Sequence, residues 1–173
     1  MPVLGFVAAS GTGKTTLLSL LIPLLRARGL RCAVIKHSHH DFEVDRPGKD
    51  SHRLREAGAG QVVLASPHRT FLVEEGDGIS EPVLADQLGR LSPERMDLVL
   101  VEGFRQETLP KIEIHRPDLG ARLICLDDPD IIALATDTEP LGMPALPLLP
   151  LNEPDVIADF VAEWVRDRRR EQR

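Results

Sequence analysis

The 173-residue sequence predicts an α/β fold with a mostly parallel, doubly wound sheet, flanking helices and an additional antiparallel portion. Three observations support this fold class. Short apolar runs alternate with segments of helical periodicity, the first run leads into a glycine-bearing turn, and two later runs flank a short turn. A chain of this length can bury one hydrophobic core, so we expect residues 1–173 to form a single domain.

The first elements predict a strand–loop–helix–strand unit. Residues 3–7 are apolar and predict a strand, whereas residues 14–28 repeat leucine at helical spacing. Pro23 should bend that helix or remove one of its hydrogen bonds, and Gly29 should end it. Residues 31–36 predict the second strand, so the two strands should be parallel and joined by a right-handed crossover.

The middle of the chain predicts the antiparallel portion and two short helices. Gly58 should end the first helix, and Pro82 should lie in the first turn of the second, where proline is tolerated. The expected elements are a helix at 49–57, strands at 61–65 and 70–74 around a turn at 66–68, and a helix at 80–91.

The second half of the chain predicts the rest of the sheet and a closing helix. Residues 97–101 form a continuous apolar run after one acid, as expected for a buried parallel strand. Residues 140–150 hold four prolines and predict an irregular connection. Residues 155–170 predict an amphipathic helix. Further strands are expected at 111–115, 122–126 and 131–135.

The composition excludes several classes of protein. A net charge of −6 argues against nucleic acid as the main partner, and five arginines in residues 166–173 are expected to form a solvated helix end. No apolar run approaches the roughly 20 residues of a membrane span, and no secretion signal is evident, so we expect a cytoplasmic protein. Cys32 and Cys125 lie in apolar runs and are expected to be buried, reduced thiols.

The turn after the first strand carries the most specific motif. Residues 8–15 are A-A-S-G-T-G-K-T and match G-x-x-x-x-G-K-[ST] except at Ala8, which is tolerable if its φ is negative. Backbone N–H groups of such a loop bind phosphate oxygens, Lys14 should reach the β- and γ-phosphates, and the Thr15 hydroxyl should bind Mg²⁺. The motif predicts a P-loop nucleotide-binding domain. The candidate phosphate-binding residues are Ser10, Gly11, Thr12, Gly13, Lys14, Thr15 and Thr16.

A carboxylate follows the apolar run at 97–101. Glu102 should lie at the carboxyl end of this strand, where ligands of doubly wound sheets bind. A carboxylate there can hold Mg²⁺ through water or position an attacking water. Glu102 is therefore the candidate catalytic residue and, with Thr15, the candidate metal ligand. The alternative is a helix-capping or salt-bridged glutamate.

Polar residues also follow the second strand. Residues 36–42 are K-H-S-H-H-D-F and residues 45–51 are D-R-P-G-K-D-S, which favours contact with phosphate or another anionic ligand. Three histidines within four residues are compatible with a metal site, but the spacing matches no structural zinc pattern. A solvated loop is the remaining interpretation.

A second acid ends a later apolar run, at Asp137. An aspartate at this place can accept hydrogen bonds from N1–H and N2–H of guanine, which adenine does not offer, and would select GTP. The alternative is an ordinary turn residue, because a full base-reading motif would carry an Asn/Thr-Lys-x-Asp run.

Four segments together resemble the MobB family of molybdopterin-guanine dinucleotide biosynthesis adaptor proteins. They are A-A-S-G-T-G-K-T-T-L-L, I-K-H-S-H-H-D-F, D-R-P-G-K-D-S with R-x-A-G-A, and L-V-L-V-E-G-F. The resemblance covers residues 2–164 and places Lys36, His37, Asp45 and Lys49 in the family signature without fixing their individual roles. It implies binding of GTP and Mg²⁺, weak GTPase activity, and a homodimer built on a shared sheet.

The resemblance also implies partners. The protein would support the guanylyltransferase that joins GMP to molybdopterin, and an upstream protein carrying molybdopterin is a further candidate. Two other functions stay open. One is an ATP-dependent small-molecule kinase or ligase, in which Lys36 and the histidines would hold an acceptor and Asp41 would activate it. The other is a protein that uses the loop only for inorganic phosphate or another anion.

Overall fold

The computed structural model describes the chain except residues 39–41, 43–44, 139–144 and 172–173. The chain divides into two compact units. We call Met1–His37 with Val83–Arg173 the sheet unit, and Ser38–Pro82 the hairpin unit. Each is described by itself below, and the single domain expected for residues 1–173 stays a prediction.

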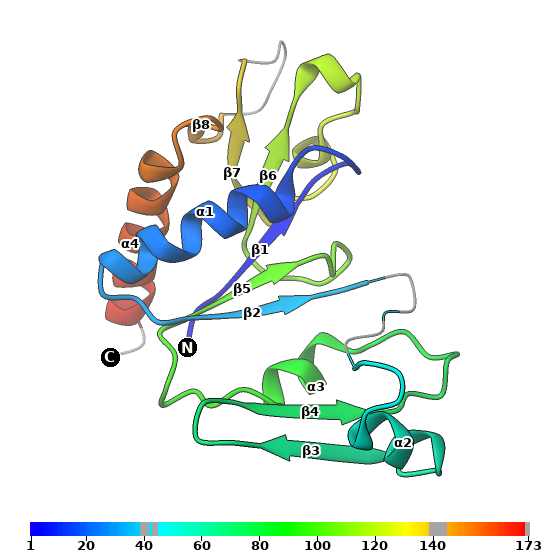
Figure 1. Cartoon of the computed structure of the whole chain (residues 1–173). Coiled ribbons are helices and arrows are strands. Elements are labelled where there is room, and N and C mark those ends of the chain that lie inside the picture. The colour runs from blue at the N-terminus through cyan, green and yellow to red at the C-terminus, as the bar shows by residue number, and fades with distance from the viewer. Residues whose placement is uncertain (39–41, 43–44, 139–144, 172–173) are drawn as a thin grey trace. The chain divides into compact units, whose positions relative to one another are not determined.

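The sheet unit is built on six parallel strands (Figure 1). Their order is β2-β5-β1-β6-β7-β8, and every neighbouring pair is parallel. This confirms the predicted α/β fold with its mostly parallel sheet. The strands are β1 (Val3–Val7), β2 (Cys32–Lys36), β5 (Leu98–Glu102), β6 (Lys111–His115), β7 (Ile131–Thr136) and β8 (Leu148–Pro150).

Helices cover both faces of this sheet because side chains alternate along each strand. On β5, Leu98 and Leu100 belong to one buried cluster, whereas Val99 and Val101 belong to another. The first cluster includes residues of α1 (Lys14–Ala27) and α4 (Pro154–Glu171), and the second includes Leu84 of α3 (Leu84–Gly89). The helix α1 continues through Pro23. The sheet is thus doubly wound, as predicted.

The hairpin unit contains one helix and one antiparallel pair of strands. The helix is α2 (Asp50–Glu56), and the strands are β3 (Gln61–Ala65) and β4 (Thr70–Glu74). The Ser66 hydroxyl oxygen closes the turn by accepting hydrogen bonds from the N–H groups of His68 and Arg69. The predicted antiparallel portion is therefore confirmed.

The strand predicted at residues 122–126 is wrong. The structure has a 3₁₀ helix, η2 (Ile124–Leu126), because the N–H groups of Ile124 and Cys125 each donate to the Glu113 carboxylate at 2.8 Å instead of to a neighbouring strand. A second 3₁₀ helix, η1 (Pro117–Leu119), follows β6.

Two other predicted elements have different bounds. The helix expected at 80–91 is the shorter α3, and Pro82 precedes it instead of lying in its first turn. The Asp77 carboxylate accepts the N–H groups of Ile79 and Ser80 and so holds the preceding residues in a turn. Residues 148–150, expected to be irregular, form β8 because they pair with β7 at the edge of the sheet.

Candidate functional site

The carboxyl ends of β1, β5 and β2 lie side by side and position the predicted phosphate site. Strand β5 lies between the other two, and Glu102 is in register with Lys36 on β2 and with Phe6 on β1. The loop at residues 8–13 leaves the end of β1 and enters α1. The sheet therefore brings the P-loop, Lys36 and Glu102 to one edge, as the sequence predicts.

The backbone of the P-loop has the conformation that its glycines permit. Gly11 has φ 80° and Gly13, the N-cap of α1, has φ 94°, both in the left-handed region that L side chains disfavour. A Cβ at either glycine would meet no protein atom within 4 Å, so the space beside the loop is open. Among the described residues only Phe104 is a non-glycine with positive φ, so the methyl group of Ala8 is accommodated.

The first turn of α1 carries no acidic side chain. The unpaired N–H groups and the positive end of the helix dipole are therefore not neutralised by the protein, which favours an anion at this end. The Lys14 ammonium adds a cation here. It lies 3.3 Å from the carbonyl oxygens of both Ala8 and Ala9, curled over the loop.

The hydroxyl side chains of the loop have different surroundings. Thr12 is buried, and its hydroxyl donates to the Ala9 carbonyl at 2.8 Å, so this side chain braces the loop. Ser10 and Thr16 are exposed. The Thr15 hydroxyl donates to Glu102 Oε1 at 2.8 Å across 87 positions of sequence.

Lys36 completes a triangle with Thr15 and Glu102. Its Nζ lies 3.1 Å from Thr15 Oγ1 and 3.2 Å from Glu102 Oε1. Glu102 is buried, only 7% exposed, so its charge needs these partners. One hydroxyl oxygen and one carboxylate oxygen side by side fit Mg²⁺, a hard cation that takes oxygen ligands and keeps several waters. The salt-bridged glutamate considered from sequence also holds, because Glu102 pairs with Lys36 at this same place.

A tight turn follows Glu102. The His37 N–H donates to the Glu102 carbonyl at 2.8 Å, and the His37 ring stacks on Phe104 with centroids 4.7 Å apart. Gly103 has φ 95° and Phe104 has φ 51°. A Cβ at Gly103 would lie 2.7 Å from His37 Cβ, so only glycine fits. Backbone strain of this kind concentrates at functional sites.

Asp137 lies just beyond β7 and is paired with Arg116, a residue that the sequence analysis missed. The Arg116 guanidinium pairs with the Asp137 carboxylate, while its Nε donates to the Thr12 carbonyl at 3.2 Å. Arg116 thus links Asp137 to the P-loop. Its position directly after β6, at the carboxyl edge of the sheet, is the signal that could have identified it.

A cavity of about 250 Å³ adjoins Asp137. It lies between the ends of β7 and β8, and its lining combines backbone, hydroxyl and aliphatic groups. The lining residues are Thr136, Asp137, Thr138, Leu148, Leu149 and Pro150.

The hairpin unit holds two of the predicted ligand contacts, Asp45 and Lys49, so they are not placed relative to the P-loop. The Asp45 carboxylate accepts the Ser51 hydroxyl and the Arg46 N–H, each at 2.9 Å, and forms a longer ion pair with Arg55. These contacts order the loop before α2, and the Lys49 side chain is exposed.

The histidine segment is only partly described. Of its residues, His39, His40 and Asp41 lie outside the described residues, so the acceptor-activating role of Asp41 stays a prediction. Among the residues that the structure does describe, no group of three or more His, Cys, Asp or Glu side chains is arranged to hold a metal ion.

Buried charges on β6 have structural partners. Lys111 is 1% exposed, and its ammonium lies 3.0 Å from Asp128 and 3.5 Å from Asp130. Gly5 makes room for it, because a Cβ there would lie 2.9 Å from Lys111 Cγ. These contacts tie β6 to the segment before β7 and give the buried ammonium two carboxylate partners.

The two cysteines are free thiols, as predicted, but each is only partly buried and not buried as expected. Burial raises the pKa of the Cys32 thiol to about 11, and burial together with the Glu113 charge raises the pKa of Cys125 to about 11. Both thiols are therefore protonated at neutral pH and are poor nucleophiles.

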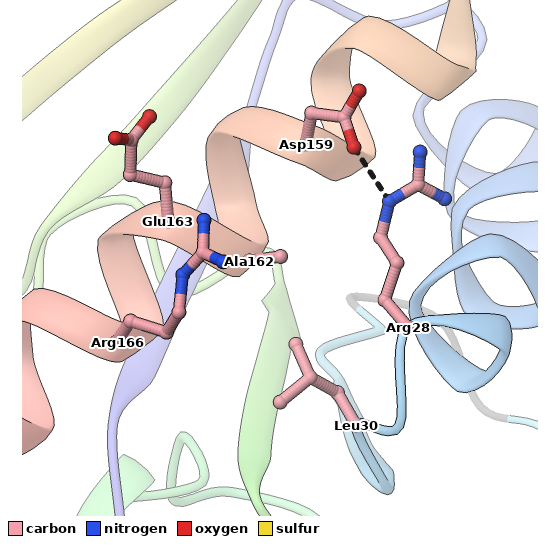
Figure 2. Close-up of a pocket in the computed structure, with 6 residues that line it drawn as sticks. All are labelled: Arg28, Leu30, Asp159, Ala162, Glu163 and Arg166. Carbon is pink, nitrogen blue, oxygen red and sulfur yellow. Dashed lines mark hydrogen bonds and ion pairs between the residues drawn. The ribbon is translucent and has the colours of Figure 1, made fainter.

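A larger cavity, about 380 Å³, lies away from this chemistry (Figure 2). It is a groove between the carboxyl end of α1 and one side of α4, and Arg28 Nε pairs with Asp159 across it at 2.7 Å. Lys14 begins α1 and Arg28 follows its end, so the groove is about 20 Å from the P-loop. The lining residues are Arg28, Leu30, Asp159, Ala162, Glu163 and Arg166.

Among the residues that the structure describes, no helix combines the length and the apolar character that a bilayer crossing requires.

Comparisons with known proteins agree on one family. The sequence model of the family described as molybdopterin guanine dinucleotide synthesis protein B, MobB, matches residues 3–137. The molybdopterin-guanine dinucleotide biosynthesis adapter protein of Escherichia coli (strain K12) is 46% identical over 169 residues, covering 96% of this chain and 94% of the relative. The adapter protein of the same name from Haemophilus influenzae is 46% identical over 166 residues, covering 95% and 90%.

A solved structure agrees with this result. The crystal structure of molybdopterin-guanine biosynthesis protein B is 28% identical to this chain, with a TM-score of 0.70 over 95% of this chain and 99% of that one.

Proposed function

Because the chain belongs to the MobB family, we propose that it is a GTP-binding adaptor with weak, Mg²⁺-dependent GTPase activity in the synthesis of molybdopterin guanine dinucleotide. One observation carries the nucleotide part of this proposal. The Thr15 hydroxyl, which directly follows the P-loop lysine, donates to the buried Glu102 at 2.8 Å at the carboxyl edge of the sheet.

The phosphate chain would be bound mainly by the backbone. Gly11 and Gly13 let N–H groups of the loop face one anion, and the amino end of α1 adds its dipole. Lys14 would leave its carbonyl partners, which at 3.3 Å hold it weakly, and reach the β- and γ-phosphates. Lys14→Ala should therefore remove GTP binding in a calorimetric titration, and unchanged affinity would contradict the nucleotide assignment.

Weak hydrolysis follows from how Glu102 is engaged. Bound Mg²⁺ would neutralise developing charge on the phosphates. Thr15 and Glu102 would hold it, Thr15 through its hydroxyl oxygen. Glu102 would be occupied in holding the metal ion and would not be free to accept a proton from water, so the chain would position the nucleotide better than it activates water. We expect slow turnover that Glu102→Gln lowers further, measured as phosphate release.

Guanine selection would depend on Asp137. The cavity beside it lies beyond the ends of neighbouring strands on the side of the sheet where Arg116 connects to the P-loop. The Asp137 carboxylate can accept hydrogen bonds in addition to its contact with Arg116, because a carboxylate offers about four acceptor positions. A fluorescence titration with Mg²⁺ should give tighter binding of GTP than of ATP, and Asp137→Asn should remove the preference. Equal affinities in the parent protein would favour the kinase, ligase or simple anion-binding alternatives.

A homodimer built on a shared sheet is the proposed assembly. In the hairpin unit Val63 and Leu72 form a cross-strand pair and are 62% and 45% exposed. A two-stranded hairpin is marginally stable alone, and its edges offer unpaired N–H and C=O groups. Val63→Glu should lower the mass measured by light scattering, whereas Leu119→Glu, at a leucine of the sheet unit that is 51% exposed, should not.

The adaptor role is tested with the proposed partner. Purified guanylyltransferase should bind this protein and change its rate of dinucleotide formation when the protein and GTP are added. If the partner neither binds nor changes its rate, the adaptor role is wrong even where GTP binding holds. A molybdopterin-carrying upstream protein is the second partner to assay in the same mixture.

A further inference from the structure

The triangle of Lys36, Thr15 and Glu102 brings an ammonium to the two oxygens proposed to hold Mg²⁺. Lys36 Nζ lies 3.1 Å from Thr15 Oγ1 and 3.2 Å from Glu102 Oε1, and these two oxygens lie 2.8 Å apart. The register of the sheet fixes this meeting, because Lys36 and Glu102 are directly paired on adjacent strands.

The hydrogen-bond directions show why the ammonium and a metal ion would compete. An ammonium only donates, so Thr15 Oγ1 accepts from Lys36 while its own hydrogen is donated to Glu102. A metal ion at Thr15 would bind the same oxygen through its second lone pair, directly beside the ammonium. It would also share the Glu102 charge with a second cation a few ångströms away, which is repulsive.

We propose that Lys36 is a tethered cation that holds Thr15 and Glu102 in place when Mg²⁺ is scarce and must leave them when Mg²⁺ binds. This inference rests on the proposed nucleotide function of the site. Lys36 is suited to the role because its side chain is 53% exposed, so the ammonium can swing into solvent at little cost. Glu102 is only 10% exposed at its side chain and cannot follow.

The proposal separates two effects of removing the ammonium. In Lys36→Met, Mg²⁺ meets no competing cation, so half-maximal binding should need about tenfold less Mg²⁺, the size expected for one charge-assisted hydrogen bond at a half-exposed group. Without Mg²⁺, the variant should bind nucleotide more weakly than the parent, because the loop has lost a nearby positive charge.

The experiment titrates the full chain with a fluorescent, non-hydrolysable GTP analogue at fixed Mg²⁺ concentrations from micromolar to millimolar, and in EDTA. Direct Mn²⁺ binding, followed by electron paramagnetic resonance, gives a readout that does not depend on hydrolysis. Lys36→Arg retains the positive charge and should stay close to the parent. Arg26→Met removes an exposed cation from α1 and controls for net charge.

The outcomes are distinguishable. A lower half-saturating Mg²⁺ concentration in Lys36→Met, with the parent value in Arg26→Met, supports the competing cation. An unchanged or higher value in Lys36→Met overturns it while leaving GTP binding intact. No analogue binding by the parent at any Mg²⁺ concentration would instead show that the proposed nucleotide function has failed.

Discussion

Gly103→Ala tests the close contact between Gly103, which follows β5, and His37, which follows β2. Two costs combine at this position. Gly103 has φ 95°, and holding an L residue in the left-handed region costs about 1–2 kcal/mol. The new Cβ would also lie 2.7 Å from His37 Cβ, and relieving such overpacking costs about 1–3 kcal/mol.

The chain offers a matched control in Gly29. It has φ 80° at the end of α1, but a Cβ there would meet nothing within 4 Å. Gly29→Ala therefore carries the backbone cost alone, about 1–2 kcal/mol, whereas Gly103→Ala should cost about 2–5 kcal/mol. Urea denaturation followed by circular dichroism measures both changes in the free energy of unfolding.

The functional consequence separates the two variants further. Relief of the clash must move His37 or the turn after Glu102, and either movement disturbs the His37–Phe104 stack. We expect Gly103→Ala to weaken GTP binding and Gly29→Ala to leave it unchanged. Equal destabilisation by the two substitutions, with parent affinity in both, would refute the close contact on which this reasoning depends.

Three further predictions concern parts of the sheet unit outside the P-loop. Hydrogen bonds from the Arg31 side chain and backbone N–H lower the pKa of the Asp97 carboxyl. Its stabilising contribution is therefore present above about pH 4 and is lost as the pH falls. In Asp97→Asn, the free energy of unfolding should depend less on pH between about pH 4 and 2 than in the parent. Burial raises the pKa of Cys32 and Cys125 to about 11, so both should react with iodoacetamide at pH 8 far more slowly than free cysteine, unless urea is added. Glu113→Gln should lower the free energy of unfolding by about 1–3 kcal/mol, because an amide NH₂ would face an N–H donor of η2; an unchanged urea midpoint would contradict this.

Sequence patterns were sufficient where local physics decides the outcome. The P-loop and the strand and helix around it follow from glycine spacing and hydrophobic periodicity, and Glu102 lies at a strand end as its position after an apolar run predicts. The bounds of the two antiparallel strands in the hairpin unit could be predicted from the turn between them. These features depend on residues within a few positions of each other.

Long-range contacts decided the rest. Residues 122–126 look like a strand from their apolar content, but the buried Glu113 carboxylate takes two of their N–H groups and leaves a 3₁₀ helix. Residues 148–150 look irregular from their prolines, yet β7 offers them a free edge. Periodicity carries no information about which distant segment will compete for a hydrogen bond.

The features of the candidate site also fall into two groups, those that the sequence predicts and those that only the structure identifies. The sequence by itself determined the residue types at the sheet edge, because a phosphate loop needs glycines, a lysine and a hydroxyl at fixed spacing. Only the tertiary structure decided that Lys36 shares its ammonium between Thr15 and Glu102, and that Arg116 joins Asp137 to the loop. The physical reason is that strand order and register, set by packing of the whole sheet, bring together side chains far apart in sequence.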